Sequence, residues 1–534
     1  MKRLWKSFWK LAMGGPERAG AQPLIAGYRH SIPPIVLVAG FAALAISLFL
    51  YGFYFSINAP ARIMPFTVPI ALLGGLVIWG LPPGNYAPTK ALEPLFMTFF
   101  AALILWPNYL AIALPSLPWV TLLRLIGVPL IVTLLICVSV SAAFRAKLAD
   151  VINTDKPMWR LLAGVVVVQT LSLALSLDRG ASINRWIIAQ VNWTAIFFVA
   201  CVVFMRKGFA EYWVRTLLAM LIALCMFGLW EARIQHVPWA GHIPSFLKVQ
   251  DENVQRILNG ASRAATGIYR VQATATTSLG FAEILGLSIP FAMHMMFERY
   301  PFILRVITAL YIPLAVYVIL LTDSRLGVVA ALASVLFYLL IWAVLRWRQQ
   351  KHSVFGPAIV LTYPAIFAAF VAATFFIGRL RAQVWGDGSQ AASTESRLDQ
   401  WMMAFPKIAR NPVGYGIGES ANALGFTNGA GILTIDSYYL SILLEIGVMG
   451  FVLYYGLMLR GIWVAARTVV GARADQEIRL LLPMAVSLIN FVIVKSVLSQ
   501  DANHPVIFMM LGAIVALTYR ARKQQEAEAN AARA

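Results

Sequence analysis

Long apolar stretches separated by short polar segments make up most of the chain. A helix needs about 20 apolar residues to cross a membrane, with a usual range of about 17–25. Stretches of this kind occur near residues 32–55, 63–81, 91–113, 119–144, 158–177, 186–205, 212–230, 278–297, 302–321, 325–345, 355–377, 438–459, 480–498 and 502–519. The pattern predicts an all-α, polytopic integral membrane protein with about 14 transmembrane helices, in a range of about 12–14.

Two polar segments are much longer than the rest, residues 231–277 and 378–437. The second stands immediately before the twelfth apolar stretch, and long polar loops held between rigid elements often carry function. The other expected divisions are a cytoplasmic amphipathic N-terminus over 1–31, a single polytopic membrane domain over 32–520, and a cytoplasmic tail over 521–534. Residues 378–437 are therefore the first place to look for a site.

Composition supports this interpretation, because 60% of the residues are hydrophobic and only 12% are charged. Soluble domains have roughly 45–50% apolar and about 25% charged residues. The net charge of +20 comes from small basic clusters scattered between apolar stretches. That distribution is typical of membrane topology and argues against nucleic acid as a partner.

The basic clusters also predict an orientation, since cytoplasmic loops carry the excess of Lys and Arg. Clusters lie at the N-terminus, at 145–147, at 346–351 and at 520–523, whereas the intervening loop 114–118 has none. Both termini are expected in the cytoplasm. The loops 231–277 and 378–437 are then expected on the opposite, periplasmic side.

Arg325 lies between two apolar stretches with almost no loop around it. One interpretation is an arginine that snorkels or caps a helix while paired with Asp323. The other is a fixed cation that faces an outer cavity and binds phosphate, for which the guanidinium group is well suited.

Arg397 and Trp401 are four residues apart in the second long loop. A short helix capped by Thr394 or Ser396 would present both side chains on one face. An ordinary solvated amphipathic helix would have the same spacing.

Asp436 comes directly before the apolar stretch 438–459. A carboxylate there can act as a general base toward a sugar hydroxyl. It can also cap the following helix, and the two roles are compatible.

Five further positions are candidates. Lys495 and Glu445 lie within apolar stretches, where a structural ion pair is favoured over catalysis. His504 faces the outer side and is a reserve base. Gly416 and Gly418 belong to a compact glycine turn that follows no buried strand, so they form no dinucleotide motif. The three cysteines, Cys137, Cys201 and Cys225, lie in apolar stretches without metal-ligand spacing, and neither a metal nor another cofactor is predicted.

Four sequence elements, in this order, resemble the bacterial O-antigen ligase and polymerase superfamily. They are Ser324-Arg325-Leu326-Gly327, Arg397-x-x-x-Trp401, Pro412-x-Gly-x-Gly-x-Gly418, and Asp436-Ser437-Tyr438-Tyr439-Leu440 with the segment 444–450 after it. The resemblance covers about residues 265–505, whereas the first two hundred residues match only as generic spanning helices.

The resemblance implies glycosyl transfer without metal on the periplasmic face of the bacterial inner membrane, from undecaprenyl pyrophosphate to an acceptor sugar hydroxyl. Arg325 and Arg397 would hold the pyrophosphate. Family ligases usually carry a histidine where this chain has Asp436, which favours a polymerase with Asp436 as the base. The expected substrate-binding residues are Arg270, Trp401, Gly416, Gly418, Lys495 and His504.

Two alternatives remain beside a polysaccharide polymerase. A ligase would transfer the finished glycan to a different acceptor. A flippase for lipid-linked oligosaccharide would have two related halves with charged or broken helices near the midplane, whereas here the polar residues gather in outer loops of the C-terminal half. The expected partners are the lipid-linked oligosaccharide, the acceptor glycan and the lipid bilayer, with a chain-length regulator as a further possibility.

Overall fold

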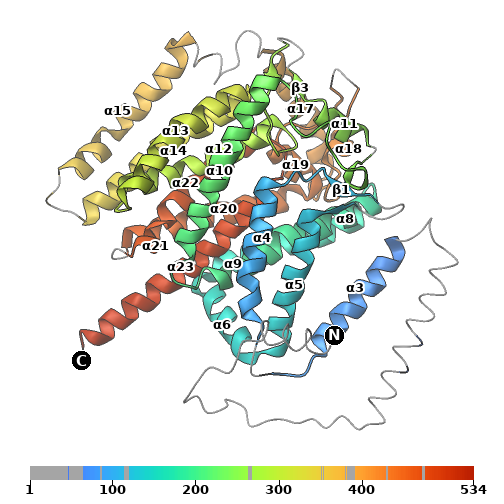
Figure 1. Ribbon diagram of the computed structural model, residues 1–534, viewed down its shortest axis with the longest axis horizontal. Coiled ribbons are helices and arrows are strands. Elements are labelled where there is room, and N and C mark those ends of the chain that lie inside the picture. The colour runs from blue at the N-terminus through green and yellow to red at the C-terminus, as the bar shows by residue number, and fades with distance from the viewer. Residues whose placement is uncertain are drawn as a thin grey trace. The chain divides into compact units, whose positions relative to one another are not determined.

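The computed structural model describes residues 64–84, 87–113, 119–249, 251–262, 267–349, 354–378, 391–428, 431–471 and 475–533, with Ala42, Ile46, His352 and Arg381 (Figure 1). The described part of the chain is almost entirely helical, and 11 of its helices are long and apolar enough to cross a membrane. The prediction of an all-α polytopic membrane protein is confirmed. The N-terminal segment 1–31 lies outside the described residues, as does 32–55 apart from Ala42 and Ile46.

The chain forms two compact units. The first contains Met1–Phe99, Asn108–Ala149 and Ile243–Gln250. In it, α3 packs on α5, and Ser139 Oγ donates a hydrogen bond of 2.5 Å to Ile78 O. Its elements are α3 (Met64–Trp79), η1 (Thr89–Ala91), β1 (Ala111–Ile112), β2 (Val120–Thr121), α5 (Leu122–Val140) and η5 (Ser245–Leu247), with β1 and β2 antiparallel and Ala111 opposite Thr121.

The second unit contains Phe100–Pro107, Asp150–His242 and Asp251–Ala534. Two of the five places where the chain passes from one unit to the other fall within helices, in α4 (Leu92–Leu105) and α6 (Ala142–Ile152). The first half of the second unit consists of η2 (Asn153–Asp155), α7 (Lys156–Ser172), η3 (Leu173–Leu175), α8 (Arg179–Ala189), the π-helical turn η4 (Gln190–Thr194), α9 (Ala195–Val203), α10 (Phe209–Ile234), α11 (Glu252–Leu258), and the antiparallel pair β3 (Ala261–Ser262) and β4 (Tyr269–Arg270).

The second half of this unit holds the core helices and the polar loop. Its elements are α12 (Ser278–Phe297), α13 (Phe302–Leu321), α14 (Arg325–Gln349), α15 (Phe355–Phe376), α17 (Ala391–Arg410), α18 (Ser420–Leu424), α19 (Tyr438–Glu445), α20 (Gly447–Gly471), α21 (Gln476–Arg479), α22 (Leu481–Lys495) and α23 (His504–Ala531).

The core of the second unit is built around α12, which packs against α13, α14 and α22 (Figure 1). A Cβ atom added to Gly286 would meet Ala330 Cβ at 2.7 Å, so the glycine allows α12 and α14 to approach closely. A buried hydrogen bond of 2.6 Å from Asn490 Nδ2 to Ser334 Oγ joins α22 to α14. Elsewhere α20 packs on α7 and α22, and α23 packs on α9.

Two predicted spans differ from the structure among the described residues. The stretch 91–113 forms α4, whose 14 residues are short for a crossing, and the described part of the stretch 63–81 forms the 16 residues of α3. The stretch 438–459 does not form one helix, because the chain turns after Glu445 and Gly447 has a φ of 70°. The amide of Val448 donates to Pro412 O at 2.9 Å, which holds this break in place.

Candidate functional site

The helix α17 carries the polar residues on which the sequence analysis centred. One face of α17, with Trp401, Ala404 and Ile408, packs against α18 and α19. Leu424 of α18 and Leu440 of α19 belong to the same apolar cluster. Residues three apart on a helix share a face, so 394, 397 and 400 form a second row along α17. The predicted cap at Thr394 or Ser396 is wrong, because α17 begins at Ala391 and both residues lie inside it.

Arg325 is the first residue of α14, and its guanidinium reaches this row. Its Nη1 donates a long hydrogen bond of 3.5 Å to Thr394 Oγ1, across 69 residues of sequence. The start of α14 is held closely: the amide of Gly327 faces Ser324 Oγ at 3.4 Å, and a Cβ atom on Gly327 would lie 2.6 Å from Ile319. The packing of α14 therefore sets the position of this cation.

Arg270 lies next to the same turn. Its Nε donates to Thr322 O at 3.1 Å, three residues before Arg325. The segment that carries Arg270 is fastened by the buried carboxylate of Glu231, which accepts from Tyr269 OH at 2.8 Å and from the amide of Ala273 at 2.7 Å. Arg325, predicted to bind pyrophosphate, and Arg270, predicted to bind substrate, are therefore attached to one short turn.

Arg397 is half-buried on α17. Burial lowers the pKa of its guanidinium, and the negative charge of Asp436 opposes that shift. Its Nε is buried and has no hydrogen-bond partner among the described residues. A buried donor without an acceptor is costly, so this group is suited to an anionic ligand.

Asp436 is held by Gln400, one turn after Arg397 on α17. Gln400 Oε1 accepts from the amide of Asp436 at 2.8 Å, and Gln400 Nε2 donates to Asp436 Oδ2 at 3.2 Å. Gln400 is 0% exposed. The predicted capping role of Asp436 is wrong, because α19 begins at Tyr438 and has Ser437 at its N-cap.

The glycine turn links two distant parts of the second unit. Gly414, Gly416 and Gly418 have φ values of 99°, 107° and 87°. A Cβ atom on Gly416 would lie 2.6 Å from Ser176 Cα. The amide of Gly416 donates to Glu445 O at 3.0 Å. The turn therefore packs the region after α7 against the end of α19.

Gly416 and Gly418 thus have a clear packing role, and substrate binding by them stays a prediction. The Glu445 carboxylate interacts with the backbone of Gly418. The same carboxylate accepts from Ser420 Oγ at 2.8 Å. These contacts bring protein atoms, rather than an open cavity, to the turn.

Lys495 forms an ion pair of 2.8 Å with Glu283, and the two side chains are 0% and 1% exposed. Lys495 Nζ also donates to Gln500 O, and Asn503 Nδ2 donates to Glu283 Oε2 at 2.8 Å. The favoured interpretation of Lys495 as a structural ion-pair partner matches these contacts. Its substrate-binding role stays a prediction.

His504 is enclosed by aromatic rings. It stacks on Trp193 with ring centroids 5.0 Å apart, and the ring of Tyr438 lies 4.6 Å away. The side chain is 0% exposed, and neither ring nitrogen has a hydrogen-bond partner among the described residues. The ring of Tyr438, which lies two residues after Asp436 in sequence, helps to cover His504. The prediction that His504 faces outward is therefore wrong.

Sequence reasoning missed Gln400, Glu283 and Arg185. Arg185 forms an ion pair of 2.6 Å with Asp501, and its Cγ would lie 3.0 Å from a Cβ atom on Gly418. A charge at the edge of an apolar stretch was a usable signal for Arg185 and Glu283. For Gln400 the signal was its spacing of three residues from Arg397.

The site can be summarised as three cations and one carboxylate around α17 and the turn before α14. Contacts join Arg270 and Arg325 to this region, and Arg397 lies with Asp436 and Gln400 on α17. No group of three or more His, Cys, Asp or Glu side chains that could hold a metal occurs in the part of the chain that the structure describes. The arrangement offers anion binding beside a possible proton acceptor.

Comparison with known families finds one match. Residues 310–455 match the family model described as O-Antigen ligase. The matched segment includes Arg325, Arg397, the glycine turn and Asp436, and it excludes Arg270, Lys495 and His504. No curated protein matches the chain.

Proposed function

We propose that this chain, whose residues 310–455 match the family model described as O-Antigen ligase, is an enzyme of the O-antigen ligase/polymerase type that moves a glycan from undecaprenyl pyrophosphate to an acceptor sugar hydroxyl. The family supports a membrane glycosyltransferase of the ligase or polymerase type. We propose that the donor is a glycan on undecaprenyl pyrophosphate, that the reaction takes place on the periplasmic side, and that both termini lie in the cytoplasm. We further propose that the protein joins lipid-linked repeat units into a polymer.

The observation that carries the proposal is the row of side chains along α17. Arg325 reaches Thr394, Arg397 follows one turn later, and Gln400 holds Asp436 one turn after that. A pyrophosphate leaving group needs cations, and an acceptor hydroxyl needs a proton acceptor. The side chains that meet both requirements are arranged along about two turns of α17.

In the proposed reaction, the Asp436 carboxylate accepts the proton of the acceptor hydroxyl. The hydroxyl oxygen forms a bond to the anomeric carbon of the donor sugar while the bond from that carbon to the pyrophosphate oxygen breaks. The pyrophosphate leaves with the bonding electron pair, and Arg325 and Arg397 stabilise its added negative charge. Gln400 keeps Asp436 in place through the two hydrogen bonds between their side chains and backbone.

Two aspects of the chain bear on the choice between polymerase and ligase. The family description names a ligase, which makes transfer to a different acceptor the second candidate. Asp436 stands where the ligases that this chain resembles usually have a histidine, which favours the polymerase. Both reactions use the same leaving group and the same cations, so the acceptor distinguishes them.

The test is turnover by the purified full chain. Undecaprenyl-pyrophosphate-linked oligosaccharide is supplied without nucleotide, and the products are separated by size. A ladder of longer lipid-linked glycans that is lost in Arg397→Ala is expected. Arg410→Ala is the matched control, because Arg410 is an exposed residue at the other end of α17.

The other results are equally informative. Transfer to an added lipid acceptor without a ladder would identify a ligase. Movement of the intact lipid across liposomes without any new glycosidic bond would contradict the enzyme and support the flippase. Asp436→Asn should abolish transfer and leave donor binding intact, and full activity in this variant would remove Asp436 as the base.

A further inference from the structure

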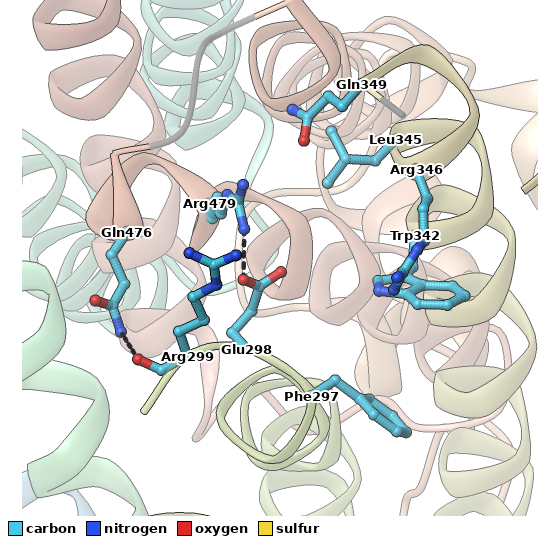
Figure 2. Close-up of a pocket in the computed structure, with 9 residues that line it drawn as sticks. All are labelled: Phe297, Glu298, Arg299, Trp342, Leu345, Arg346, Gln349, Gln476 and Arg479. Atoms are coloured by element: carbon cyan, nitrogen blue, oxygen red, sulfur yellow. Dashed lines mark hydrogen bonds and ion pairs between the residues drawn. The ribbon is translucent and has the colours of Figure 1, made fainter. Parts of the chain in front are cut away.

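A cavity of about 520 Å³ lies at the end of the bundle formed by the last residues of α12 and α14 with α21 (Figure 2). Its walls include Glu298 and Arg299 after α12, Trp342 and Arg346 on α14, and Arg479 on α21. A volume of this size is typical of ligand sites, which measure about 300–1,000 Å³. The cavity is therefore large enough for a small ligand or a lipid headgroup.

This cavity is far from the row on α17. Arg325 is the first residue of α14, and Arg346 is near its end. A rise of 1.5 Å per residue separates these two positions by roughly 30 Å, which is about the thickness of the hydrocarbon core. The cavity and the proposed glycosyl-transfer site thus belong to opposite ends of the membrane-crossing helices.

The charges of the cavity are mainly positive. Three guanidinium groups, those of Arg299, Arg346 and Arg479, line it with the single carboxylate of Glu298. Figure 2 shows the Glu298 carboxylate next to the guanidinium groups of Arg299 and Arg479, with Arg346 beside Trp342 on the opposite wall. Glu298 Oε2 accepts from Arg479 Nη1 at 2.6 Å, so it neutralises only one of the three cations.

The hydrogen-bond donors of the cavity exceed its acceptors. The buried Nε atoms of Arg346 and Arg479 have no hydrogen-bond partner among the described residues. The Arg346 guanidinium lies 5.1 Å from the centroid of the Trp342 ring, which orients it. Gln476 Nε2 donates to Arg299 O at 3.3 Å, which ties α21 to the end of α12. The ligand that completes this site must bring acceptor atoms and negative charge.

We propose that this cavity binds a phosphate group at the membrane face opposite the glycosyl-transfer site. Guanidinium groups from three separate elements surround the space, and a phosphate offers oxygen acceptors in several directions. The phosphate of an anionic phospholipid and free inorganic phosphate share this chemistry. A cationic pocket at the ends of membrane-crossing helices, next to exposed Phe297 and half-buried Trp342, is a typical place for a lipid headgroup.

The experiment uses the purified full chain in a mild detergent. Native mass spectrometry counts molecules of phosphatidylglycerol or phosphatidylcholine that the protein retains, and calorimetric titration measures binding of inorganic phosphate. The test variants are Arg346→Gln, Arg299→Gln and the double variant. The control is Arg348→Gln, which removes an exposed charge from the same helix and does not line the cavity. Thermal unfolding checks that each variant is folded.

We expect the double variant to reduce retention of phosphatidylglycerol at least tenfold, with no change in phosphatidylcholine and no change in Arg348→Gln. If inorganic phosphate binds and loses its affinity in the same variants, while the two lipids are retained equally, the site takes free phosphate. If neither ligand responds to the double variant, or if Arg348→Gln causes an equal loss, the proposal is overturned. Each single variant provides the same test should the double variant not fold.

Discussion

Lys495 and Arg397 are both basic residues removed from bulk water, but their surroundings differ. Lys495 is fully buried against Glu283 and has a second acceptor at Gln500 O. Arg397 is half-buried, with a nearby charge at Asp436 but a buried Nε that has no partner among the described residues. In a membrane protein the satisfaction of hydrogen bonds, more than burial itself, separates a charge that stabilises the fold from one that is available to a ligand.

The largest expected effect is a loss of stability on breaking the buried ion pair between Lys495 and Glu283. Lys495→Met leaves Glu283 charged and buried without its cation, and removal of one partner of a buried pair costs about 3–5 kcal/mol. The free energy of unfolding should fall by this amount, measured as loss of thermal stability in detergent. The double variant Lys495→Met with Glu283→Gln should recover most of the loss. A single variant as stable as the native protein would show that this pair does not support the fold.

The next effect belongs to the site on α17. Arg397→Ala and Arg325→Ala should each lower the rate of glycan transfer by about 10²–10³-fold, since each removes a group that stabilises developing charge. Their thermal stability should stay close to that of the native protein. Arg397→Lys should also be impaired, because an ammonium group does not reproduce the guanidinium fork. Normal turnover by both alanine variants would contradict the proposed pyrophosphate site.

The glycine turn is expected to give a smaller effect on stability. Gly416→Ala forces an alanine into a φ of 107° and brings its Cβ within 2.6 Å of Ser176 Cα. Backbone strain alone costs about 1–3 kcal/mol, which thermal unfolding will detect. The matched control is Gly431→Ala, because Gly431 also has a positive φ but nothing lies within 4 Å of its added Cβ. Equal losses in both variants would mean that the contact with Ser176 is unimportant.

The smallest expected effect concerns the residue that positions Asp436. Gln400→Leu removes both hydrogen bonds to Asp436. We expect a roughly tenfold fall in kcat, equivalent to about 1.4 kcal/mol, with KM for the lipid-linked donor unchanged. A rise in KM at constant kcat would instead indicate that Gln400 contributes to donor binding.

Sequence patterns predicted local structure well in this chain. Ten of the predicted spans correspond to helices that are long and apolar enough to cross a membrane, because each is a continuous apolar stretch. The eleventh such helix, α20, overlaps only the second part of the predicted span 438–459. The spacing of Arg397 and Trp401 correctly indicated a helix. The break at Gly447 escaped prediction, because it depends on the contact between Val448 and Pro412, which lie on opposite sides of α18 and α19 in sequence.

The site was predicted only in part for the same reason. Arg325, Arg397 and Asp436 could be selected as candidates from local sequence. The spacing of Gln400 from Arg397 indicates only a shared helix face, and its pairing with Asp436 could not be predicted, since that partner is 36 residues away. Glu283 and Lys495 are separated by more than two hundred residues. Partners so distant become visible only when helices pack, and the same is true of the aromatic enclosure around His504.

The two arginines of α14 have a consequence for how this helix can move. Arg325 and Arg346 are separated by about the thickness of the hydrocarbon core, roughly 30 Å. Sliding α14 along the membrane normal would draw one guanidinium into lipid at a cost of about 2.5–3.5 kcal/mol on insertion scales. The two arginines therefore oppose any shift of α14 along the membrane normal. Any rearrangement that admits a bulky substrate is expected to tilt or rotate neighbouring helices around α14, rather than to drive it as a piston.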